Sequence, residues 1–367
     1  MHKSSVEHST PTIVGNYKVY NVNNTTFEVP NYYTVLKVLG FGAYGLVCSV
    51  LDTRSNEKVA IKKCKGVFRD VEDGKRVLRE IALMKFFRNH ENLLPIIDVL
   101  PPLDGPKFKD VYMVMPLLDV DLNVVLRSKQ ALEESHYQYF VYQMLRGLKY
   151  LHSAGVAHRD LKPANLVTNI ACELRICDFG LSRAIDDSEL TGYVVTRWYR
   201  PPELLIGANT YDTSVDIWSV GCIFAELYTR RPIFPGKTST DQLRMLCEAF
   251  GKPPLDDIRD KDALKMIKEM PDTPPIGLAK LVPKLTNPEG LDFLSKMLCM
   301  DHRQRWTAGE LMTHPFMKAL HDPDDEPVCK KQFHWDLEGV EMDKNTLRQG
   351  FWNEMCYFHS ELKQVHQ

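Results

Sequence analysis

Three glycines near the start of the chain are the first residues whose spacing suggests chemistry. Gly40-Phe-Gly-Ala-Tyr-Gly45 has the pattern G-x-G-x-x-G, in which backbone amides can approach phosphate groups closely. A dinucleotide-binding unit would need a helix directly after the last glycine. Residues 46–51 and 58–63 are instead rich in β-branched and apolar residues, which predicts two strands. The glycines are therefore expected in a hairpin, and a plain glycine-rich turn without a ligand is the alternative.

Charged residues further along the chain favour a phosphate-handling site. Val59-Ala-Ile-Lys62 places a lysine on the second of these strands, and Glu80 follows in a segment of helical spacing. A lysine that grips phosphates needs a carboxylate to orient it. His158-Arg-Asp-Leu-Lys-Pro-Ala-Asn165 and Asp178-Phe-Gly180 come later, in that order. One such element could arise by chance, but the ordered set argues for a catalytic site.

The ordered set resembles the signature of eukaryotic protein kinases, from about Tyr33 to Phe316. The resemblance implies an α+β bilobal fold, with a small β-rich N-lobe and a larger helical C-lobe, and ATP and Mg²⁺ as cofactors. It implies Asp160 as the base that accepts the substrate hydroxyl proton and Lys162 as the group that steadies the transferring phosphoryl. The remaining implied roles are phosphate binding by Lys62 tied to Glu80, and Mg²⁺ binding by Asn165 and Asp178.

The same resemblance implies where the nucleotide binds. Backbone groups of Leu117 and Leu118 would meet adenine, and Asp121 would meet the ribose. Val47, Ala60 and Val167 would contact the two faces of the base, although apolar residues of this kind are equally common in a hydrophobic core. The implied nucleotide-binding residues are Gly40, Gly42, Gly45, Val47, Ala60, Lys62, Met115, Leu117, Leu118, Asp121 and Val167.

The segment between Asp178 and Glu203 corresponds to a kinase activation loop. Its Thr191-Gly-Tyr193, followed by Val-Val-Thr-Arg-Trp-Tyr-Arg, resembles the lip of mitogen-activated protein (MAP) kinases of the Thr-Gly-Tyr, stress-activated type. The resemblance implies that an upstream dual-specificity kinase phosphorylates Thr191 and Tyr193. Each phosphate adds about −1.5 to −2 charge and needs cations to receive it. The implied receivers are Arg76, Arg79, Arg159 and Arg183 for Thr191, and Arg197 and Arg200 for Tyr193.

Further features have counterparts in MAP kinases. Glu203 is expected to pair with Arg305, and Asp322, Asp324 and Asp325 resemble an acidic patch that docks basic motifs of activators and substrates. A solvated acidic turn is the alternative for that patch. The family also implies substrates with Ser/Thr-Pro sites. The departures from the family pattern are Met115 as gatekeeper, Asp119 in the hinge, Ile170 and Ala171 in place of acidic residues, Val195 in place of a small residue, and Pro201 in place of alanine.

Composition limits the class of protein. The chain has 367 residues, a formal net charge of −2 and nine scattered cysteines. These numbers predict no general attraction to nucleic acid or membrane and no disulfide scaffold. No apolar run is long enough for a transmembrane helix. We expect a monomeric protein of the cytoplasm and also of the nucleus, with its cysteines in the reduced form. Its expected partners are upstream kinases, substrates and phosphatases.

The elements that must position these residues follow from periodicity. Strands are also expected over 33–39 and 111–115, and helices over 73–87, 136–152, 214–228, 241–250 and 291–299. A Pro-rich stretch, 271–283, is expected to be irregular, and 347–362 to form an amphipathic helix. The expected divisions are a flexible extension at 1–16, an N-lobe at 17–118, a C-lobe at 119–320 with activation loop 178–203 and an insertion at about 252–282, and a tail at 321–367.

Two other classes of protein are weighed against the kinase. A catalytically weak scaffold would keep the fold but show damage at Lys62, Asp160, Asn165 or Asp178, and all four are intact. A cyclin-dependent kinase would lack the Thr-Gly-Tyr lip, the insertion and the acidic turn. The sequence therefore favours an active MAP kinase.

Overall fold

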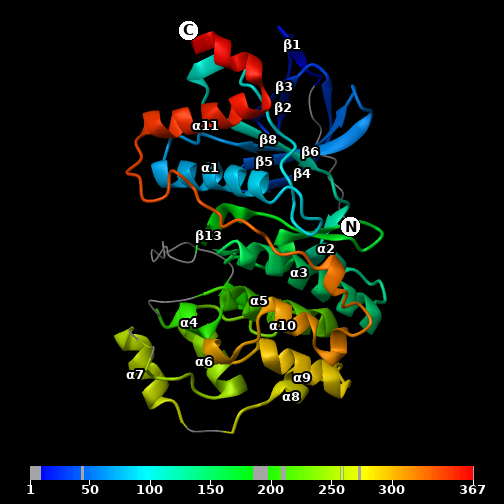
Figure 1. Ribbon diagram of the computed structural model, residues 1–367, viewed down its shortest axis with the longest axis vertical. Helices are drawn as coiled ribbons and strands as arrows, with labels where there is room; N and C mark the ends of the chain where they lie inside the picture. The colour runs from blue at the N-terminus through cyan, green and yellow to red at the C-terminus, as the bar shows by residue number, and fades with distance from the viewer. Residues whose placement is uncertain are drawn as a thin grey trace. The chain divides into compact units, whose positions relative to one another are not determined.

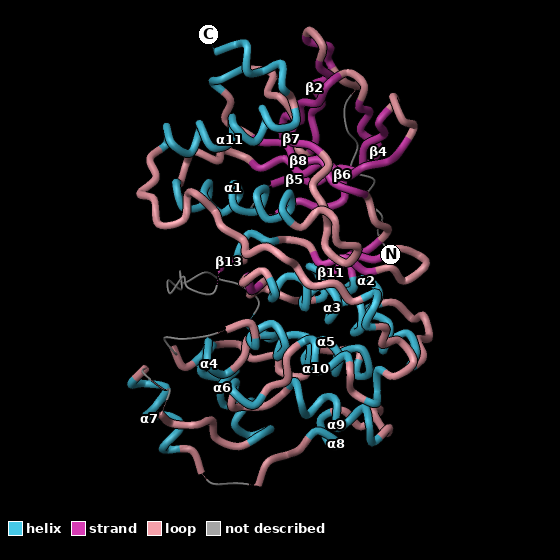
Figure 2. Tube along the Cα trace, in the orientation of Figure 1, coloured by secondary structure: helices cyan, strands magenta, loops and turns pink. Residues whose placement is uncertain are grey.

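The chain forms two units, each with its own core. The computed structural model describes residues 10–42, 45–184, 197–207, 212–256, 258, 260–271 and 274–366. Unit 1 contains Met1–Asn89, Leu94–Leu118 and Trp335–Gln367, and unit 2 contains His90–Leu93 and Asp119–His334. Strands dominate unit 1 and helices dominate unit 2 (Figures 1 and 2), which confirms the predicted α+β bilobal kinase fold.

Unit 1 is built on two antiparallel sheets. The smaller has the order β1-β2-β3, and the larger has the order β4-β5-β6-β8-β7. Tyr20 and Phe27 from the smaller sheet share one apolar core with Leu46 and Val50 from the larger. The strands are β1 (Thr12–Val14), β2 (Tyr17–Val22), β3 (Thr25–Pro30), β4 (Tyr33–Gly42), β5 (Gly45–Asp52), β6 (Glu57–Cys64), β7 (Asp98–Val99) and β8 (Val111–Pro116).

Two helices lie side by side in unit 1: α1 (Val71–Phe86) and α11 (Lys344–Phe358), which comes from the far end of the chain (Figure 1). The carboxylate of Asp70 caps α1 by accepting a hydrogen bond from the Asp73 amide. Short 3₁₀ helices, η1 (Gly105–Lys107) and η8 (Ser360–His366), complete the unit.

Unit 2 is organised around two long helices, α3 (Glu134–Ser153) and α5 (Ser214–Thr229). Helix α5 is apolar over most of its length and is buried from Val215 to Tyr228. The other α-helices are α2 (Leu122–Arg127), α4 (Pro202–Leu205), α6 (Ser239–Phe250), α7 (Lys261–Glu269), α8 (Leu278–Leu281), α9 (Pro288–Met297) and α10 (Ala308–Met312).

Unit 2 also contains small sheets and short 3₁₀ helices, which are connected by its loops. The sheets have the orders β12-β11-β9 and β10-β13. Their strands are β9 (Val120–Asp121), β10 (Val156–Ala157), β11 (Leu166–Thr168), β12 (Leu174–Ile176) and β13 (Arg183–Ala184). The 3₁₀ helices are η2 (Pro163–Asn165), η3 (Phe179–Leu181), η4 (Arg197–Tyr199), η5 (His302–Gln304), η6 (Pro315–Met317) and η7 (Pro323–Asp325).

The structure differs from the sequence predictions at three places. Residues 12–14, predicted to be a flexible extension, form β1, because Thr12 to Val14 pair with Val19 to Tyr17 across a turn. The stretch 271–283, predicted to be irregular, contains the one-turn helix α8. The tail helix ends at Phe358 and continues as 3₁₀ helix η8, short of the predicted Leu362. Among the described residues, no helix combines the length and the apolar character that crossing a membrane requires.

Candidate active site

Unit 1 brings together the lysine and the glutamate that the sequence predicted as partners. Lys62 on β6 donates to both carboxylate oxygens of Glu80 on α1, at 2.7 and 2.9 Å. Lys62 is paired across the strands with Val47 on β5 and with Met113 on β8. This strand register fixes Lys62 in the centre of the sheet, and the Glu80 carboxylate holds its ammonium group in place.

The apolar residues predicted around adenine lie on the same strands. Ala60 on β6 is paired with Met115 on β8, two residues from Lys62. Both residues are buried, with exposed fractions of 6% and 8%. Gly40, Gly42 and Gly45 belong to the β4–β5 hairpin, with Gly42 opposite Gly45. The glycine-rich element is therefore a strand hairpin, as predicted, and not the start of a helix.

Unit 2 holds the predicted catalytic base in a cluster of polar groups. Lys162 Nζ lies 2.6 Å from Asp160 Oδ2, and Asn165 Nδ2 donates to Asp160 O at 2.9 Å and to Oδ2 at 3.1 Å. Burial raises the pKa of Asp160, and the charge of Lys162 partly offsets this. The cluster holds one carboxylate oxygen between two donors, which fixes its direction.

A buried aspartate that the sequence analysis missed fixes the backbone of this loop. Asp216 on α5 accepts hydrogen bonds from the backbone N–H groups of His158 and Arg159, each at 2.8 Å. Its Oδ2 also lies 2.8 Å from His152 Nε2. Burial would raise the pKa of Asp216, but these hydrogen bonds and the histidine lower it. Arg159 has a φ of 71°, and this bidentate clamp holds the strained residue directly before Asp160. The available signal was an acid, Asp216, near the start of the apolar run Ser214–Tyr228.

The oxygen donors next to this cluster suit a hard cation. Both hydrogen bonds of Asn165 described above come from its amide nitrogen, which leaves the amide oxygen available as a ligand. The Cys177 amide donates to Asn165 O at 2.9 Å, and this bond holds the adjacent Asp178 near Asn165. Amide and carboxylate oxygens are the ligands that Mg²⁺ prefers, with water completing its shell. Within the described residues there is no cluster of three or more His, Cys, Asp or Glu side chains suited to a metal.

The remaining predicted nucleotide residues are divided between the two units. Leu117 and Leu118 end unit 1 in sequence, and Asp121 and Val167 belong to unit 2. Asp121 is paired with Val167 in the β9–β11 ladder. The Asp121 carboxylate accepts from the Val124 amide at 2.9 Å and so caps α2. A role toward ribose would use its other oxygen.

Comparison with known proteins decides the family. Residues 33–317 match the protein kinase domain. The chain is 45% identical over 348 residues to "Extracellular signal-regulated kinase 1" of Dictyostelium discoideum, which covers 93% of this chain and 65% of that protein. It is 45% identical over 345 residues to "Mitogen-activated protein kinase 3" of Arabidopsis thaliana, covering 93% of each chain. It is also 44% identical over 359 residues to "Mitogen-activated protein kinase 5" of Oryza sativa subsp. indica, covering 96% of this chain and 97% of that one.

The chain belongs to the MAP kinases. It is therefore a protein serine/threonine kinase, a transferase that binds ATP. The dual-phosphorylation motif remains a prediction, because Thr191, Tyr193 and Val195 lie outside the described residues.

The arginines on α1 of this MAP kinase have anionic partners within unit 1. Arg79, 2% exposed, donates from Nε and Nη2 to both carboxylate oxygens of Glu338, at 3.2 and 2.8 Å. Its guanidinium also lies 4.8 Å from the centre of the Trp335 ring. Arg76 pairs with Asp73 one turn earlier, at 3.1 Å. Sequence spacing could not find Glu338, because it is 259 residues away from Arg79.

Three of the other predicted phosphate receivers are described in unit 2. Burial lowers the pKa of Arg200, and the negative charge of Asp160 partly offsets this. Arg197 donates to the Lys237 carbonyl at 2.7 Å, and Arg159 lies in the loop that Asp216 clamps. The side chain of Arg183 lies outside the described residues.

The predicted pair after the activation segment is present in the MAP kinase. Arg305 donates from Nη1 and Nη2 to the two carboxylate oxygens of Glu203, at 2.5 and 2.7 Å. The side chains are 0% and 3% exposed. Arg305 also donates to the carbonyls of Cys299 and Ser214. These bonds join α4, α5 and the segment after α9.

The acidic turn after Leu320 is partly committed to internal contacts. Arg146 on α3 donates from Nη2 to the Asp325 carboxylate at 2.7 Å. Asp322 accepts from the Asp324 amide at 3.1 Å. All three aspartates are nevertheless exposed. Near the predicted companion site, Ile170 is 96% exposed and its amide donates to Asp119 Oδ2 at 2.9 Å.

Proposed function

We propose that this MAP kinase transfers the γ-phosphoryl group of Mg²⁺-bound ATP to Ser or Thr residues followed by Pro. The observation that carries this proposal is the cluster of Asp160, Lys162 and Asn165, with its single carboxylate directed by two donors. In this reaction Asp160 accepts the proton of the substrate hydroxyl as its oxygen forms a bond to the γ-phosphorus. The bond from that phosphorus to the β,γ-bridging oxygen breaks, and ADP leaves.

The other residues stabilise charge in this reaction. The ammonium of Lys162 lies beside the base, where it can neutralise an equatorial oxygen of the transferring group. Lys62, fixed by Glu80, would bind the α- and β-phosphates. Asn165 and Asp178 would hold Mg²⁺, which would neutralise negative charge on the phosphates of ATP. Such preorganised charges supply most of the rate enhancement in phosphoryl transfer.

We further propose that an upstream dual-specificity kinase switches the enzyme on at Thr191 and Tyr193, and that phosphatases reverse this. Support comes from Arg197 and Arg200, which follow the two hydroxyls within a few residues. Arg79 already binds the Glu338 carboxylate, so its proposed role as a phosphate receiver would require it to exchange that partner. Basic motifs of partner proteins would dock on Asp322, Asp324 and Asp325. The proposed state is a monomer in the cytoplasm and nucleus.

The test measures phosphate transfer from ATP and Mg²⁺ to a Thr-Pro peptide before and after phosphorylation of Thr191 and Tyr193. The expected result is strong activity only in the doubly phosphorylated wild type. The Asp160→Asn variant should lose about 10²–10⁴-fold in kcat while keeping nucleotide affinity. A peptide with Ala after Thr tests proline direction. Full activity without phosphorylation would reject the switch, and preserved nucleotide binding without any transfer would favour a scaffold.

A further inference from the structure

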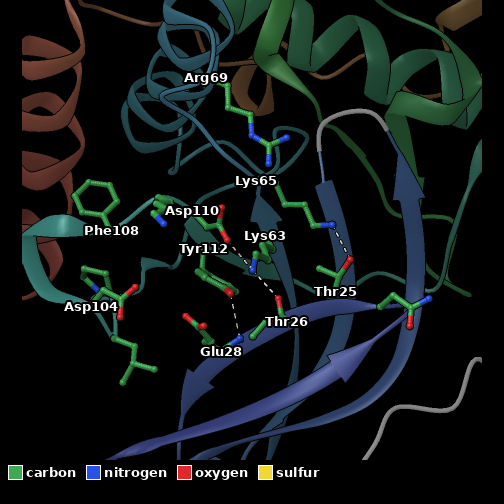
Figure 3. A pocket seen from close by; sticks show the side chains of 14 residues that line it. Thr25, Thr26, Glu28, Lys63, Lys65, Arg69, Asp104, Phe108, Asp110 and Tyr112 are labelled. Atoms are coloured by element: carbon green, nitrogen blue, oxygen red, sulfur yellow. Dashed lines mark hydrogen bonds and ion pairs between the residues drawn. The ribbon is translucent and has the colours of Figure 1, made fainter.

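A polar pocket in unit 1 lies apart from every residue assigned above. Its volume is about 360 Å³, a size that accommodates a small ligand or one modified side chain. Its walls come from the start of β3, the end of β6 and the loop before β8 (Figure 3). The lining is rich in lysine, arginine, threonine and aspartate, which points to an ionic ligand.

A buried lysine fixes the floor of the pocket. The Lys63 side chain is 4% exposed. Its ammonium donates to the Thr26 carbonyl at 2.5 Å and pairs with Asp110 Oδ2 at 2.7 Å, as Figure 3 shows. The hydroxyl of Tyr112 accepts from the Glu28 amide at 3.0 Å. These contacts tie three segments together, so the pocket does not depend on a ligand to form.

Three further cations surround this floor: Lys65, Arg69 and Lys109. Within the part of the chain that the structure describes, none of them forms an ion pair. Lys65 donates to the hydroxyl of Thr25 at 2.6 Å, which directs its ammonium toward β3. All three side chains are exposed, and like charges that line one pocket repel each other unless an anion lies between them.

Arg69 is held against the pocket by the turn before α1. Its amide donates to the Gly66 carbonyl at 2.8 Å. Gly66 has a φ of +58°, and a Cβ on it would lie 2.7 Å from Arg69 Nε. The Gly66 amide donates to Asp110 Oδ1 at 2.8 Å. The absence of a side chain at Gly66 therefore lets the arginine fold back over the turn, toward the rest of the lining.

The carboxylates of the pocket leave these cations in excess. Asp110 is committed to Lys63 and to the Gly66 amide. Burial raises the pKa of Glu28, the charge of Lys63 opposes this, and Asp104 and Asp110 add to the rise. The third acid, Asp104, is exposed at the rim. The three acids thus face four cations, since Asp110 is paired with Lys63 and the other two face Lys65, Arg69 and Lys109.

We propose that this pocket binds a phosphate monoester. A phosphate dianion carries three acceptor oxygens and about two negative charges. Those oxygens match the ammonium groups of Lys65 and Lys109 and the guanidinium of Arg69, which can donate two parallel hydrogen bonds. The source is a phosphorylated side chain of a peptide or a small phosphorylated compound. This inference does not depend on the kinase reaction.

Isothermal titration calorimetry on the full chain tests the proposal. The nucleotide site is first saturated with an ATP-competitive inhibitor that contains no phosphate. Three probes are then titrated: inorganic phosphate, O-phospho-L-threonine, and a peptide with one phosphothreonine. Binding of all three with similar Kd indicates a small compound as the source, and tighter binding of the peptide indicates a protein segment.

Variants of the lining distinguish this pocket from any other anion site. Arg69→Gln and Lys109→Gln should each raise Kd about tenfold, as expected for a lost charge-assisted hydrogen bond. Asp104→Asn should lower Kd about two- to fivefold, because it removes a like charge from the rim. Lys58→Gln, an exposed lysine at the other end of β6, is the matched control and should leave Kd unchanged.

The gain in affinity from Asp104→Asn is the decisive arm, because a misfolded variant cannot bind more tightly. Kinase activity of each variant reports separately on folding. The proposal is wrong if none of the three probes gives a heat of binding, or if Lys58→Gln weakens binding as much as Arg69→Gln. Competition between the probes and the inhibitor would also overturn it, since the probes would then occupy the nucleotide site.

Discussion

Asp160 lies among groups that change its acidity in opposite directions. Its burial favours the neutral carboxyl, whereas the ammonium of Lys162 favours the carboxylate, and burial has the larger effect. A general base works only when it is deprotonated. The raised pKa therefore determines the acidic side of the pH profile. It also makes the carboxylate more basic than an ordinary aspartate, which suits proton acceptance.

The first prediction concerns this pH dependence. In the activated enzyme kcat should fall as pH falls through the pKa of Asp160, and the midpoint should lie above the ordinary aspartate value of about 3.9. Lys162→Met should move the midpoint to higher pH, because it removes the charge that lowers this pKa. Single-turnover rates measured from pH 8 down to the lowest pH at which the enzyme stays folded, at saturating ATP, provide the measurement. A lower rate with an unchanged midpoint would mean that Lys162 does not act on Asp160.

The second prediction concerns the contribution of the buried Glu203–Arg305 ion pair to stability. Glu203→Ala leaves the fully buried guanidinium of Arg305 without its carboxylate. The free energy of unfolding should therefore fall by about 3–5 kcal/mol. Chemical denaturation followed by tryptophan fluorescence measures this. The double variant Glu203→Leu/Arg305→Met should recover part of the loss, because it removes both charges. A double variant less stable than Glu203→Ala would contradict this account.

At the scale of single residues, the sequence predicted the residue pairs that lie within known motifs. It did not predict partners outside those motifs. Lys62 and Glu80 could be matched because both belong to an ordered signature. The partner of Arg79 could not, since Glu338 is distant in sequence and belongs to no motif. Asp216 was missed because it acts on backbone N–H groups, which all residues except proline carry and which therefore leave no mark in the sequence.

Helices α1 and α11 approach each other closely at one glycine. Gly74 lies in the first turn of α1, where alanine would normally be preferred. A Cβ at Gly74 would lie 2.2 Å from the Val67 carbonyl oxygen and 2.4 Å from Leu347 Cδ2. The glycine is thus required by the contact between the helices and by the turn before α1.

The element-scale prediction compares two glycines in helices. Gly74→Ala should lower the free energy of unfolding by about 1–3 kcal/mol, because the helices must separate or shift. Gly309→Ala on α10 is the matched control, since a Cβ there would meet no atom within 4 Å. It should stabilise by about 0.5–1 kcal/mol. Thermal unfolding of the two variants decides. Stabilisation by both would show that α1 and α11 are free to move apart.

Periodic elements were predicted well, and elements made by long-range pairing were not. The strands around Lys62 and the helices α1, α3, α5, α6 and α9 follow from apolar spacing. Residues 12–14 form β1 because β2 offers a partner, and their own sequence is too short to show periodicity. The single turn of α8 depends in the same way on its surroundings in a Pro-rich segment.

At the scale of the whole molecule, both ends of the chain contribute to unit 1. Trp335–Gln367 joins the unit formed by the N-terminal strands. Helix α11 buries Leu347, Phe351 and Met355 completely. Arg348 donates to the carbonyls of Pro106 and Phe108, and Lys85 on α1 pairs with Glu354 at 2.5 Å. The spacing of apolar residues predicts an apolar face on this helix, and the structure shows the residues that it contacts.

The last prediction concerns a truncated variant that ends at His334 and therefore lacks this tail. Each fully buried apolar side chain contributes about 1.5–3 kcal/mol, so the loss of three approaches the whole stability of a typical domain, about 5–15 kcal/mol. Unit 1 should therefore lose protection from proteolysis, while fragments of unit 2 survive. A peptide of residues 335–367 added in trans should restore protection. Gln349→Ala in the full chain, at an exposed position on α11, should leave the digestion pattern unchanged. If the truncated chain resisted protease as well as the full chain, the core of unit 1 would be complete without α11, and the tail would serve only to hold Arg79 through Glu338.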